Sequence, residues 1–385
     1  MKKKPLGIYL HIPFCVRKCN YCDFLSGPAD RAVRRAYVSR LKQEISEFEN
    51  AGEYQVQSIF FGGGTPSVLE GEEIAELMEE LGRMQLDAAA EITIECNPGT
   101  LTGDKLENYR QCGINRLSIG LQSADAKELR LLGRIHTWEM FLDNYENARR
   151  AGFTNINIDL MSALPGQTVE SWQSTLEKVL ALKPEHISAY SLIIEEGTPF
   201  YERYGAEAAM REKGQAGHEL PSEEAEREMY YDTKRLLEAA GLGRYEISNY
   251  ARPGYESRHN SGYWTRRDYA GFGLGASSLL HNLRYKNTDV LADYLEGDFS
   301  KREVLVLSKD NQIEETMYLG LRMMQGISKQ KFLEDFQVPV DVVYRSQLEL
   351  LQRKGLLRET GNRIRLTELG IDVSNRVLAE FLLTD

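Results

Sequence analysis

The stretch CVRKCNYC, residues 15–22, holds three of the five cysteines of this 385-residue chain. Cys15, Cys19 and Cys22 follow the spacing C-x3-C-x2-C. Clustered cysteines indicate metal or redox chemistry rather than disulfides when the rest of the chain has so few. Three thiolates fit a 4Fe–4S cluster with one iron left open, because such clusters normally take four cysteines. An open iron accepts an exchangeable ligand.

Two other interpretations of the cysteines stay open from the residues alone. A structural zinc site has four ligands, commonly from paired C-x2-C pieces, and would here need His11 as the fourth. Inert buried thiols are the other alternative, although thiols of that kind are rarely so dense. Cys96 and Cys112 lie far along the chain, and we interpret them as small buried hydrophobic side chains.

Length and charge bound the class of protein. The chain exceeds the usual size of a single core, so we expect one large domain and a smaller one. The net charge of −11 argues against a nucleic-acid partner held by phosphate contacts. No apolar run approaches the roughly 18 residues of a transmembrane segment. The basic residues at the N-terminus are not followed by the apolar stretch that a signal peptide would have. We expect a cytosolic protein, where thiols stay reduced.

Six short apolar segments alternate with helical ones through the first half of the chain. The predicted strands are residues 7–12, 56–61, 91–96, 115–121, 155–161 and 186–192. Helical patterns such as residues 33–52 and 169–182 separate them. Strands and helices in such a series imply a parallel sheet with right-handed crossovers. Six such units either close most of a barrel or form an open sheet with helices on both faces.

Unusual residues fall at or just past the carboxyl ends of these strands. The cysteines follow the first strand and GGGTP, residues 62–66, follows the second. Glu95 ends the third, Gln122 ends the fourth and Asp159 lies in the fifth, before LPGQT at residues 164–168. In barrels this rim carries the chemistry. The placement therefore favours a curved, partial (β/α)6 barrel.

The remainder of the chain divides into two further regions. We predict the barrel over residues 1–200, a family-specific extension over 201–305 and an α-rich, winged-helix-like domain over 306–385. The last region reads as helix, β-hairpin and helix. It carries 11 Lys and Arg against 12 Asp and Glu, so we interpret the wing as a packing or partner surface rather than a DNA reader.

At this point the sequence resembles a known family. C-x3-C-x-aromatic-C after a first strand, with a glycine triplet after the second, is similar to the radical S-adenosylmethionine (SAM) proteins. YLHIPFC, FFGGGTPS, IECNPG, RLSIGLQS, NIDLMSALPGQT and YEISNYARPG resemble oxygen-independent coproporphyrinogen III oxidase and its relatives. The resemblance implies that the open iron chelates the amino and carboxylate groups of SAM. The cofactor carries out the radical chemistry, and the protein orients the reacting groups and excludes water.

The resemblance also implies residue roles for SAM binding. Tyr9 matches a tyrosine lining the cofactor site, and Tyr21 an aromatic against the adenine. Gly63, Gly64 and Thr65 allow the backbone to approach the methionine amino end. Glu95 suits the ribose or the ammonium of SAM. The positions that reach the carboxylate and the ribose hold Gln122, Arg134 and Asp159. Each alone reads as a solvated or capping side chain, and the joint pattern carries the prediction.

Two departures separate the chain from the oxidase. The oxidase resembles C-x3-C-x2-C-x-C, and the extra position here is Phe24. Only 14 residues precede Cys15, whereas the oxidase carries a longer arm over its substrate. Both departures weigh against the decarboxylase activity.

HNSGYW, residues 259–264, fits the H-N-x-x-Y-W pattern of the heme chaperone subgroup of this family. A neutral imidazole from His259 is a common axial ligand of heme iron, and Tyr263 and Trp264 offer flat apolar surface. On residue chemistry alone, a packed core motif is the simpler interpretation. His281 is a weaker candidate for a second ligand. GFGLGASS, residues 271–278, is glycine-rich but follows no clear strand in a βαβ unit, so we expect no dinucleotide site there.

With these motifs, the resemblance implies a heme chaperone that holds a 4Fe–4S cluster and SAM and passes heme to an acceptor protein. One alternative is a radical enzyme acting on a tetrapyrrole, like the oxidase. Another is a radical methyltransferase or cyclopropanase. The acceptor and the oligomeric state are not predicted from these residues.

Overall fold

The computed structural model describes residues 3–215 and 217–383. Its main sheet has twelve strands in the order β12-β11-β10-β9-β1-β2-β3-β4-β5-β6-β8-β7. The first six strands are parallel and lie side by side in chain order: β1 (Lys4–Ile12), β2 (Tyr54–Gly63), β3 (Leu86–Cys96), β4 (Arg116–Gln122), β5 (Ile156–Ser162) and β6 (His186–Ser191).

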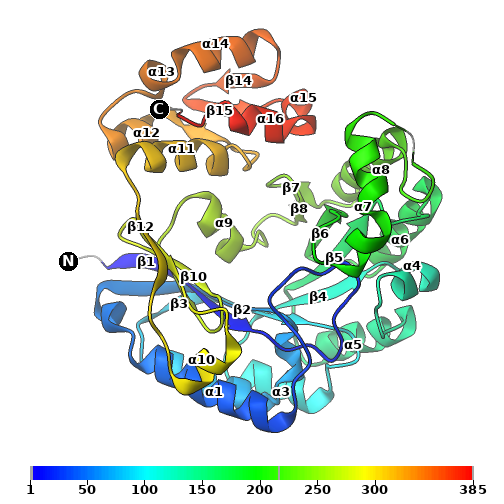
Figure 1. Ribbon diagram of the computed structural model, residues 1–385, viewed down its shortest axis with the longest axis vertical. Coiled ribbons are helices and arrows are strands. Elements are labelled where there is room, and N and C mark those ends of the chain that lie inside the picture. The colour runs from blue at the N-terminus through cyan, green and yellow to red at the C-terminus, as the bar shows by residue number, and fades with distance from the viewer. Residues whose placement is uncertain (1–2, 216, 384–385) are drawn as a thin grey trace.

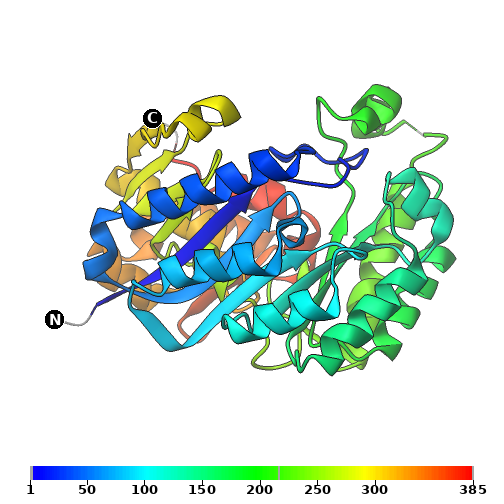
Figure 2. The ribbon, with the colours of Figure 1, turned by 90° about the horizontal axis from the view of Figure 1, so that it is seen from below.

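Six helices connect these strands and cover the convex face of the curved sheet (Figures 1 and 2). They are α1 (Arg31–Ser46), α2 (Gly71–Leu81), α3 (Gly103–Gln111), α4 (Ala126–Leu131), α5 (Trp138–Arg150) and α6 (Val169–Ala181). Apolar side chains of the strands, such as Leu6, Ile8 and Leu10, are buried in the core that these helices share. Alternate positions face inward and are often polar, as Thr93 and Glu95 of β3 are. The predicted partial (β/α)6 barrel is confirmed.

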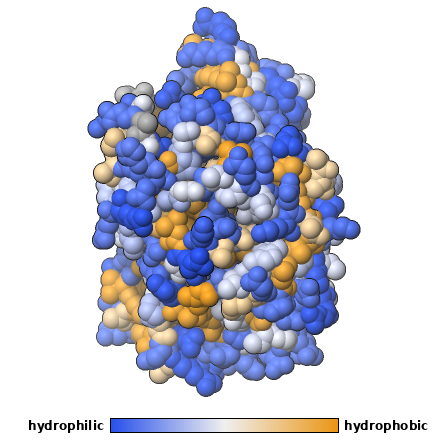
Figure 3. All heavy atoms as spheres, turned by 90° about the vertical axis from the view of Figure 1, so that its right-hand side faces the viewer, coloured by the Kyte–Doolittle hydropathy of each residue, from blue (hydrophilic) through white to orange (hydrophobic). Residues whose placement is uncertain are grey.

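The extension begins with α7 (Pro199–Glu212) and α8 (Glu223–Ala239). α8 packs on α6, where the buried Trp172 donates its indole N–H to Thr233 Oγ1 at 2.9 Å. The face that includes these helices is mostly hydrophilic, with small separate hydrophobic areas (Figure 3). The antiparallel pair β7 (Gly243–Arg244) and β8 (Asn249–Ala251) then adds to the sheet beside β6.

The next segment crosses to the other edge of the sheet. α9 (Arg258–Trp264) lies on the concave side of the barrel (Figure 1), in contact with β2. β9 (Tyr269–Phe272) then pairs in parallel with β1, and β10 (Ser277–Leu280), β11 (Leu283–Lys286) and β12 (Arg302–Val306) continue antiparallel. α10 (Leu291–Glu296) precedes β12.

A strand that the sequence analysis did not predict, β9, runs into the glycine-rich segment 271–278 and ends at Phe272. β9 spans four residues, and its partner β1 lies at the other end of the chain, so no local pattern marked it. β10, not a helix, follows the glycines, so the segment is not part of a βαβ unit. Gly273 has φ +100°, and a Cβ there would lie 2.5 Å from Tyr37 Oη.

The C-terminal residues form a helical unit around a small sheet with a core of its own. The sheet order is β13-β15-β14. The elements are α11 (Lys309–Gly320), β13 (Ile327–Ser328), α12 (Lys329–Phe336), α13 (Val340–Val343), α14 (Arg345–Arg353), β14 (Leu357–Thr360), β15 (Arg363–Leu366), α15 (Glu368–Asp372) and α16 (Ser374–Ala379). Helix, hairpin and helix follow one another as predicted.

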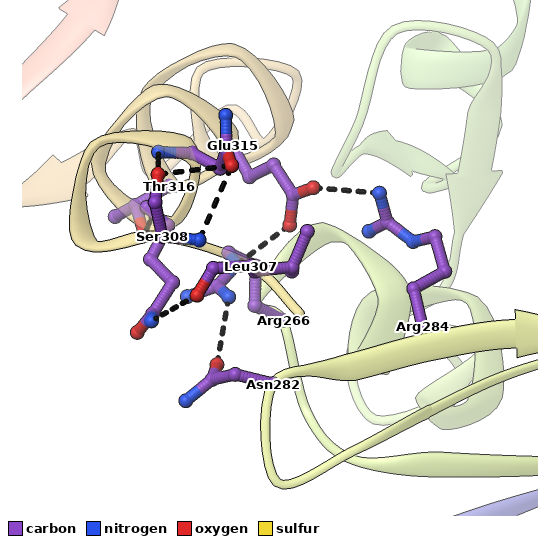
Figure 4. A network of polar contacts seen from close by, with 9 residues as sticks. Arg266, Asn282, Arg284, Leu307, Ser308, Glu315 and Thr316 are labelled. Carbon is purple, nitrogen blue, oxygen red and sulfur yellow. Dashed lines mark hydrogen bonds and ion pairs between the residues drawn. The ribbon is translucent and has the colours of Figure 1, made fainter. Parts of the chain in front are cut away.

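A buried carboxylate joins this unit to the extension (Figure 4). Glu315 of α11 accepts from Arg266 Nε at 3.0 Å and from Arg284 Nη1 at 2.7 Å. Arg266 also donates to Asn282 Oδ1 at 3.0 Å. One buried acceptor paired with two guanidinium groups holds α11, the end of α9 and the β10–β11 turn together. None of the helices within residues 3–215 and 217–383 is both long and apolar enough to cross a membrane.

A second buried carboxylate, Glu44 of α1, holds the glycine-rich segment against the barrel. It accepts from Gly273 N at 2.8 Å, Asn287 Nδ2 at 2.6 Å and Tyr294 Oη at 2.7 Å. Burial raises the pKa of Glu44 to about 7, and these three hydrogen bonds only partly offset that rise. The folded chain therefore favours the protonated form in the range from about pH 4.5 to 7.

We predict that Glu44 makes the folded state less stable as the pH rises from 4.5 to 7.5. The unfolded carboxyl releases its proton near pH 4.5 and the folded one only near pH 7. That difference corresponds to about 3 kcal/mol, present below pH 4.5 and lost above pH 7. Urea unfolding of the wild type and Glu44→Gln across this range measures it. A difference between the two proteins that stays constant with pH would contradict the prediction.

Candidate functional site

A cavity of about 390 Å³ opens at the carboxyl ends of the parallel strands. The three clustered cysteines line it, together with every residue predicted to bind SAM except Tyr9: Tyr21, Gly63, Gly64, Thr65, Glu95, Gln122, Arg134 and Asp159. These residues come from the ends of five different strands, β1 to β5, or from the loops that follow. Their convergence follows from the parallel order of the strands, which points every carboxyl end at the same rim.

The cysteine loop follows β1, is closed by a hydrogen bond of its own backbone and is held to the end of α4. Cys15 N donates to Gly27 O at 3.0 Å, and Asn20 Nδ2 donates to Leu131 O at 2.9 Å. Thr65 Oγ1 donates to Cys15 Sγ at 3.6 Å, and Arg134 Nη1 lies at the same distance from Cys19 Sγ. Two cysteine sulfurs of the loop thus each have a polar donor from the barrel beside them.

Gly63, the last residue of β2, and Gly64 bring the backbone against the end of β1 and the cysteine loop. Gly63 has φ +110°, and a Cβ there would lie 2.6 Å from His11 Cε1. At Gly64 a Cβ would lie 2.7 Å from Phe14 O and 3.0 Å from Cys15 Sγ. Any larger residue would push the loop away, so the glycines are what allow the close approach at this wall of the cavity.

Two carboxyl groups lie toward the barrel interior beneath the cavity. Gly63 N donates to Glu95 Oε2 at 3.2 Å. Burial and the nearby Asp159 raise the pKa of Glu95 to about 8. Burial also raises the pKa of Asp159, against hydrogen bonds from Asn157 and Ser118 that favour its charged form. A cation bound above them would stabilise both carboxylates, so the site suits a positively charged ligand such as a sulfonium.

Arg134 organises the far side of the cavity through the protein itself. Besides Cys19, it donates to Asn97 Oδ1 at 2.6 Å and to Gly120 O. Gln122 follows a bulge in β4 and has φ +70°, a conformation that a non-glycine residue rarely adopts. Its strained backbone turns the strand end at the cavity wall.

Several lining residues were not predicted. Asn97 donates to Thr65 Oγ1 at 2.7 Å and accepts from Arg134, so it links two predicted residues. It stands in IECNPG, directly after the third strand, and this position at the rim is the signal from which it could have been predicted. The residues after β6 also line the cavity, and Ile193 there is 68% exposed at the mouth. Phe24, on the opposite loop, is 59% exposed.

Tyr9 does not line the cavity. Its hydroxyl lies 3.0 Å from His11 Nδ1, and its ring stacks on Phe60 with centroids 6.4 Å apart. His11 Nε2 lies 2.9 Å from Leu25 O, so both nitrogens of His11 have protein partners. Tyr9 therefore supports the wall from behind.

His259 lies on α9 inside the barrel and outside the cavity. Its Nδ1 is 3.0 Å from Ser58 Oγ and its Nε2 is 2.9 Å from Tyr263 Oη. The ring stacks on Phe60 at 5.1 Å and is 2% exposed. Burial, with Arg267 nearby, lowers the pKa of His259 to about 3, so the imidazole is neutral. Its backbone N–H donates to Glu91 at 3.0 Å.

Two other residues of the heme prediction, Trp264 and His281, lie away from the His259 ring. Trp264, at the end of α9, faces the C-terminal unit, where the Arg322 guanidinium lies 4.4 Å from its ring centroid. His281 lies on the β10–β11 turn, between Lys4 Nζ at 2.9 Å and Glu53 Oε2 at 3.0 Å. Tyr263 is thus beside His259, and His281 is bound to a different set of residues.

Comparison with known proteins identifies the family. A model described as the Radical SAM superfamily matches residues 9–179, and one described as the HemN C-terminal domain matches residues 307–373. The chain is 38% identical to the heme chaperone HemW of Lactococcus lactis, over 100% of this chain and 99% of that one. It is 37% identical to HemW of Bacillus subtilis, over 97% and 98%. The chain belongs to the HemW family of radical SAM proteins.

A solved structure agrees with this placement. Coproporphyrinogen III oxidase (HemN) from Escherichia coli, described as a radical SAM enzyme, superposes with a TM-score of 0.82 and 26% identity, over 99% of this chain and 90% of that one. The family resemblance read from the sequence is therefore confirmed, and the radical SAM fold brings a 4Fe–4S cluster and SAM as its cofactors.

The residues of this HemW-family chain fit both groups. All three cysteines are unpaired and partly exposed, and all line the cavity. Among the described residues no three His, Cys, Asp or Glu side chains could hold a single metal ion, whereas a cluster takes one thiolate for each iron it binds. Cys15, Cys19 and Cys22 would hold the cluster, and the cavity beside them would hold SAM over the two carboxyl groups.

We predict that replacing Cys15, Cys19 or Cys22 with Ser removes the 4Fe–4S absorbance and most of the bound iron, because serine is a poor ligand for soft metals. Cys96→Ser and Cys112→Ser are the matched controls, since Cys96 is buried in the core and Cys112 caps α3. Iron content and visible spectra after anaerobic reconstitution measure the effect. Full iron content in the triple variant would contradict the assignment.

Proposed function

We propose that this chain is a heme chaperone that binds heme at α9 and transfers it to an acceptor protein. The observation that carries the proposal is the near full-length similarity to proteins named heme chaperone HemW, at 31–38% identity. The cluster and SAM occupy the rim of the same barrel. The acceptor is a heme protein of unspecified identity, and a cytosolic location is predicted from the reduced cysteines.

His259 has the chemistry of an axial heme ligand. The neutral imidazole is the form that binds iron, and the lowered pKa keeps it neutral throughout the physiological range. Ser58 beside Nδ1 orients the ring, as hydrogen-bonded partners do for metal-bound histidines. Nε2 is then the nitrogen available to iron once Tyr263 gives up its hydrogen bond.

In the described conformation, both ring nitrogens of His259 are engaged by protein groups. His259 is buried, and Tyr263 Oη occupies the position at Nε2 that iron would take. α9 is held on its other side by Trp264 against Arg322 and by the Arg266–Glu315 ion pair. Heme binding therefore requires Tyr263 to turn away and α9 to separate from its neighbours.

A radical enzyme acting on a tetrapyrrole is the second candidate, favoured by the TM-score of 0.82 with the oxidase. Phe24 weighs against it, since the oxidase pattern has a cysteine at this position. The exposed Phe24 also sits at the mouth of the cavity, where a substrate would enter. A third candidate, a radical methyltransferase, has no specific contact in its favour.

We predict that His259→Ala weakens hemin binding by about tenfold or more and shifts the Soret band, with the cluster intact. Partners that merely orient metal ligands already contribute about 10- to 100-fold in affinity, so the ligand itself should contribute at least as much. Hemin titration of the reconstituted protein gives both quantities. His281→Ala is the matched control, because His281 is exposed and bound to Lys4 and Glu53.

Tyr263→Phe tests the same site in the opposite direction. It removes the hydroxyl at Nε2 and keeps the ring, so hemin should bind about fivefold more tightly, the worth of one ordinary hydrogen bond. Weaker binding in Tyr263→Phe, or an unchanged spectrum in His259→Ala, would show that His259 is not the ligand.

We predict no conversion of coproporphyrinogen III to protoporphyrinogen IX by the reconstituted protein with SAM and a reductant. Analysis of porphyrins by chromatography is the measurement, with an active coproporphyrinogen oxidase as the positive control. Turnover above background would replace the chaperone with the second candidate.

A further inference from the structure

A continuous chain of hydrogen bonds runs through the barrel interior, from the SAM cavity to the first turn of α9. It begins at Asp159, which lines the cavity, and passes through Asn157 of β5 and His186 of β6. It then reaches Tyr245, between β7 and β8, and ends at the backbone of Ser257. Ser257 is the N-cap of α9, and its side chain accepts from Asn260 N.

The distances are those of ordinary or short hydrogen bonds for most of its length. Asn157 Nδ2 donates to Asp159 Oδ1 at 2.7 Å, and Asn157 Oδ1 lies 2.6 Å from His186 Nδ1. His186 Nε2 lies 2.9 Å from Tyr245 Oη, which accepts from Ser257 N at 3.3 Å. Ser118 closes a branch, with Oγ 3.0 Å from Asp159 Oδ2.

Every donor in the chain points toward Asp159. The carboxylate accepts, so the amide nitrogen of Asn157 faces it and the amide oxygen faces His186. Nδ1 of His186 must then carry the proton, and Nε2 must accept from the Tyr245 hydroxyl. The Tyr245 oxygen in turn accepts from the Ser257 amide. Burial, with Arg116 nearby, lowers the pKa of His186 well below its ordinary value, so the ring is neutral, and its two hydrogen bonds select the tautomer.

The chain cannot easily absorb a displacement at one end. Asn157, His186 and Ser257 are buried, and a buried polar group that loses its partner destabilises the fold by more than an ordinary hydrogen bond contributes. A change at Asp159 must therefore either move the next member or leave a group unsatisfied. Tyr245 is also tied to the C-terminal unit, because its carbonyl accepts from Met324 N at 2.9 Å.

We propose that His186 and Tyr245 are positioning residues that couple the occupancy of the SAM cavity to the start of α9. The coupling rests on the proposed function in taking Asp159 as a SAM residue and α9 as the heme-binding helix. SAM bound at the cavity orders Asp159 and, through the chain, the N-cap of α9. Binding at the rim thus sets how readily the helix bearing His259 opens.

Hydrogen exchange tests the coupling without heme. The full chain is reconstituted anaerobically, and exchange of the α9 amides is followed by mass spectrometry with and without SAM, in the absence of reductant. In the wild type we expect SAM to slow α9 exchange about fivefold or more, the lower end of measured couplings between sites. Equilibrium dialysis of SAM on the same samples reports its binding separately.

Tyr245→Phe breaks the chain by removing one hydroxyl, and His186→Phe breaks it at a second point. Ser188→Ala is the matched control, because Ser188 Oγ donates to Asn157 Oδ1 at 3.1 Å from the side and its loss leaves the chain continuous. Both breaking variants should bind SAM yet lose its effect on α9, whereas Ser188→Ala should keep it. The readout is the SAM-dependent change, which a general loss of stability does not produce.

Three outcomes would overturn the coupling. SAM that binds the wild type without slowing α9 exchange would do so, as would protection retained in Tyr245→Phe and His186→Phe, or lost equally in Ser188→Ala. Failure of the wild type to bind SAM in dialysis would instead overturn the cofactor site itself. Loss of heme binding alone would leave these exchange results unchanged, so the two proposals fail separately.

Discussion

Parallel pairing of β1 to β6 in chain order is the constraint on which the rest of the structure depends. It directs six carboxyl ends to one rim, so residues as far apart as Cys15 and Asp159 share a cavity. The helices occupy the convex face, where the apolar side chains point. The concave face is then left to polar side chains that only other protein groups, water or ligands can satisfy. The interior chemistry of the barrel follows from that imbalance.

The polar groups of the concave face find their partners at two depths in the barrel. Near the rim, Arg134 and Asn97 arrange the cavity wall, and the carboxyl groups of Glu95 and Asp159 face the space a cationic ligand would fill. Deeper in the barrel, α9 supplies the missing partners, with His259 bonded to Ser58 of β2. A histidine held in this way is packed core, and its neutral imidazole is also the form that the proposed heme site requires. The two interpretations of HNSGYW are therefore compatible.

Two buried carboxyl groups fasten the later parts of the chain. Glu44 fastens the glycine-rich segment to α1, and Glu315 fastens the end of α9 to the C-terminal unit through Arg266. Buried carboxylates are sensitive fasteners, because removing one partner leaves an uncompensated group. Opening of α9 would have to break the contacts of Glu315, while the contacts of Glu44 keep the edge of the barrel closed.

The sequence by itself determined the strand series, the rim positions and the family, because period-two strands, glycines and cysteine spacing are local signals. It also placed Glu95, Gln122 and Asp159 at one rim, since parallel topology follows from alternating elements. The tertiary structure alone decided that Tyr9 lies behind the wall, that β9 pairs with β1 and that Asn97 bridges two site residues. It alone showed both nitrogens of His259 to be engaged. Hydrogen bonds between residues some two hundred positions apart, as between Ser58 and His259, leave no periodic pattern in a sequence, because they arise only when distant elements pack.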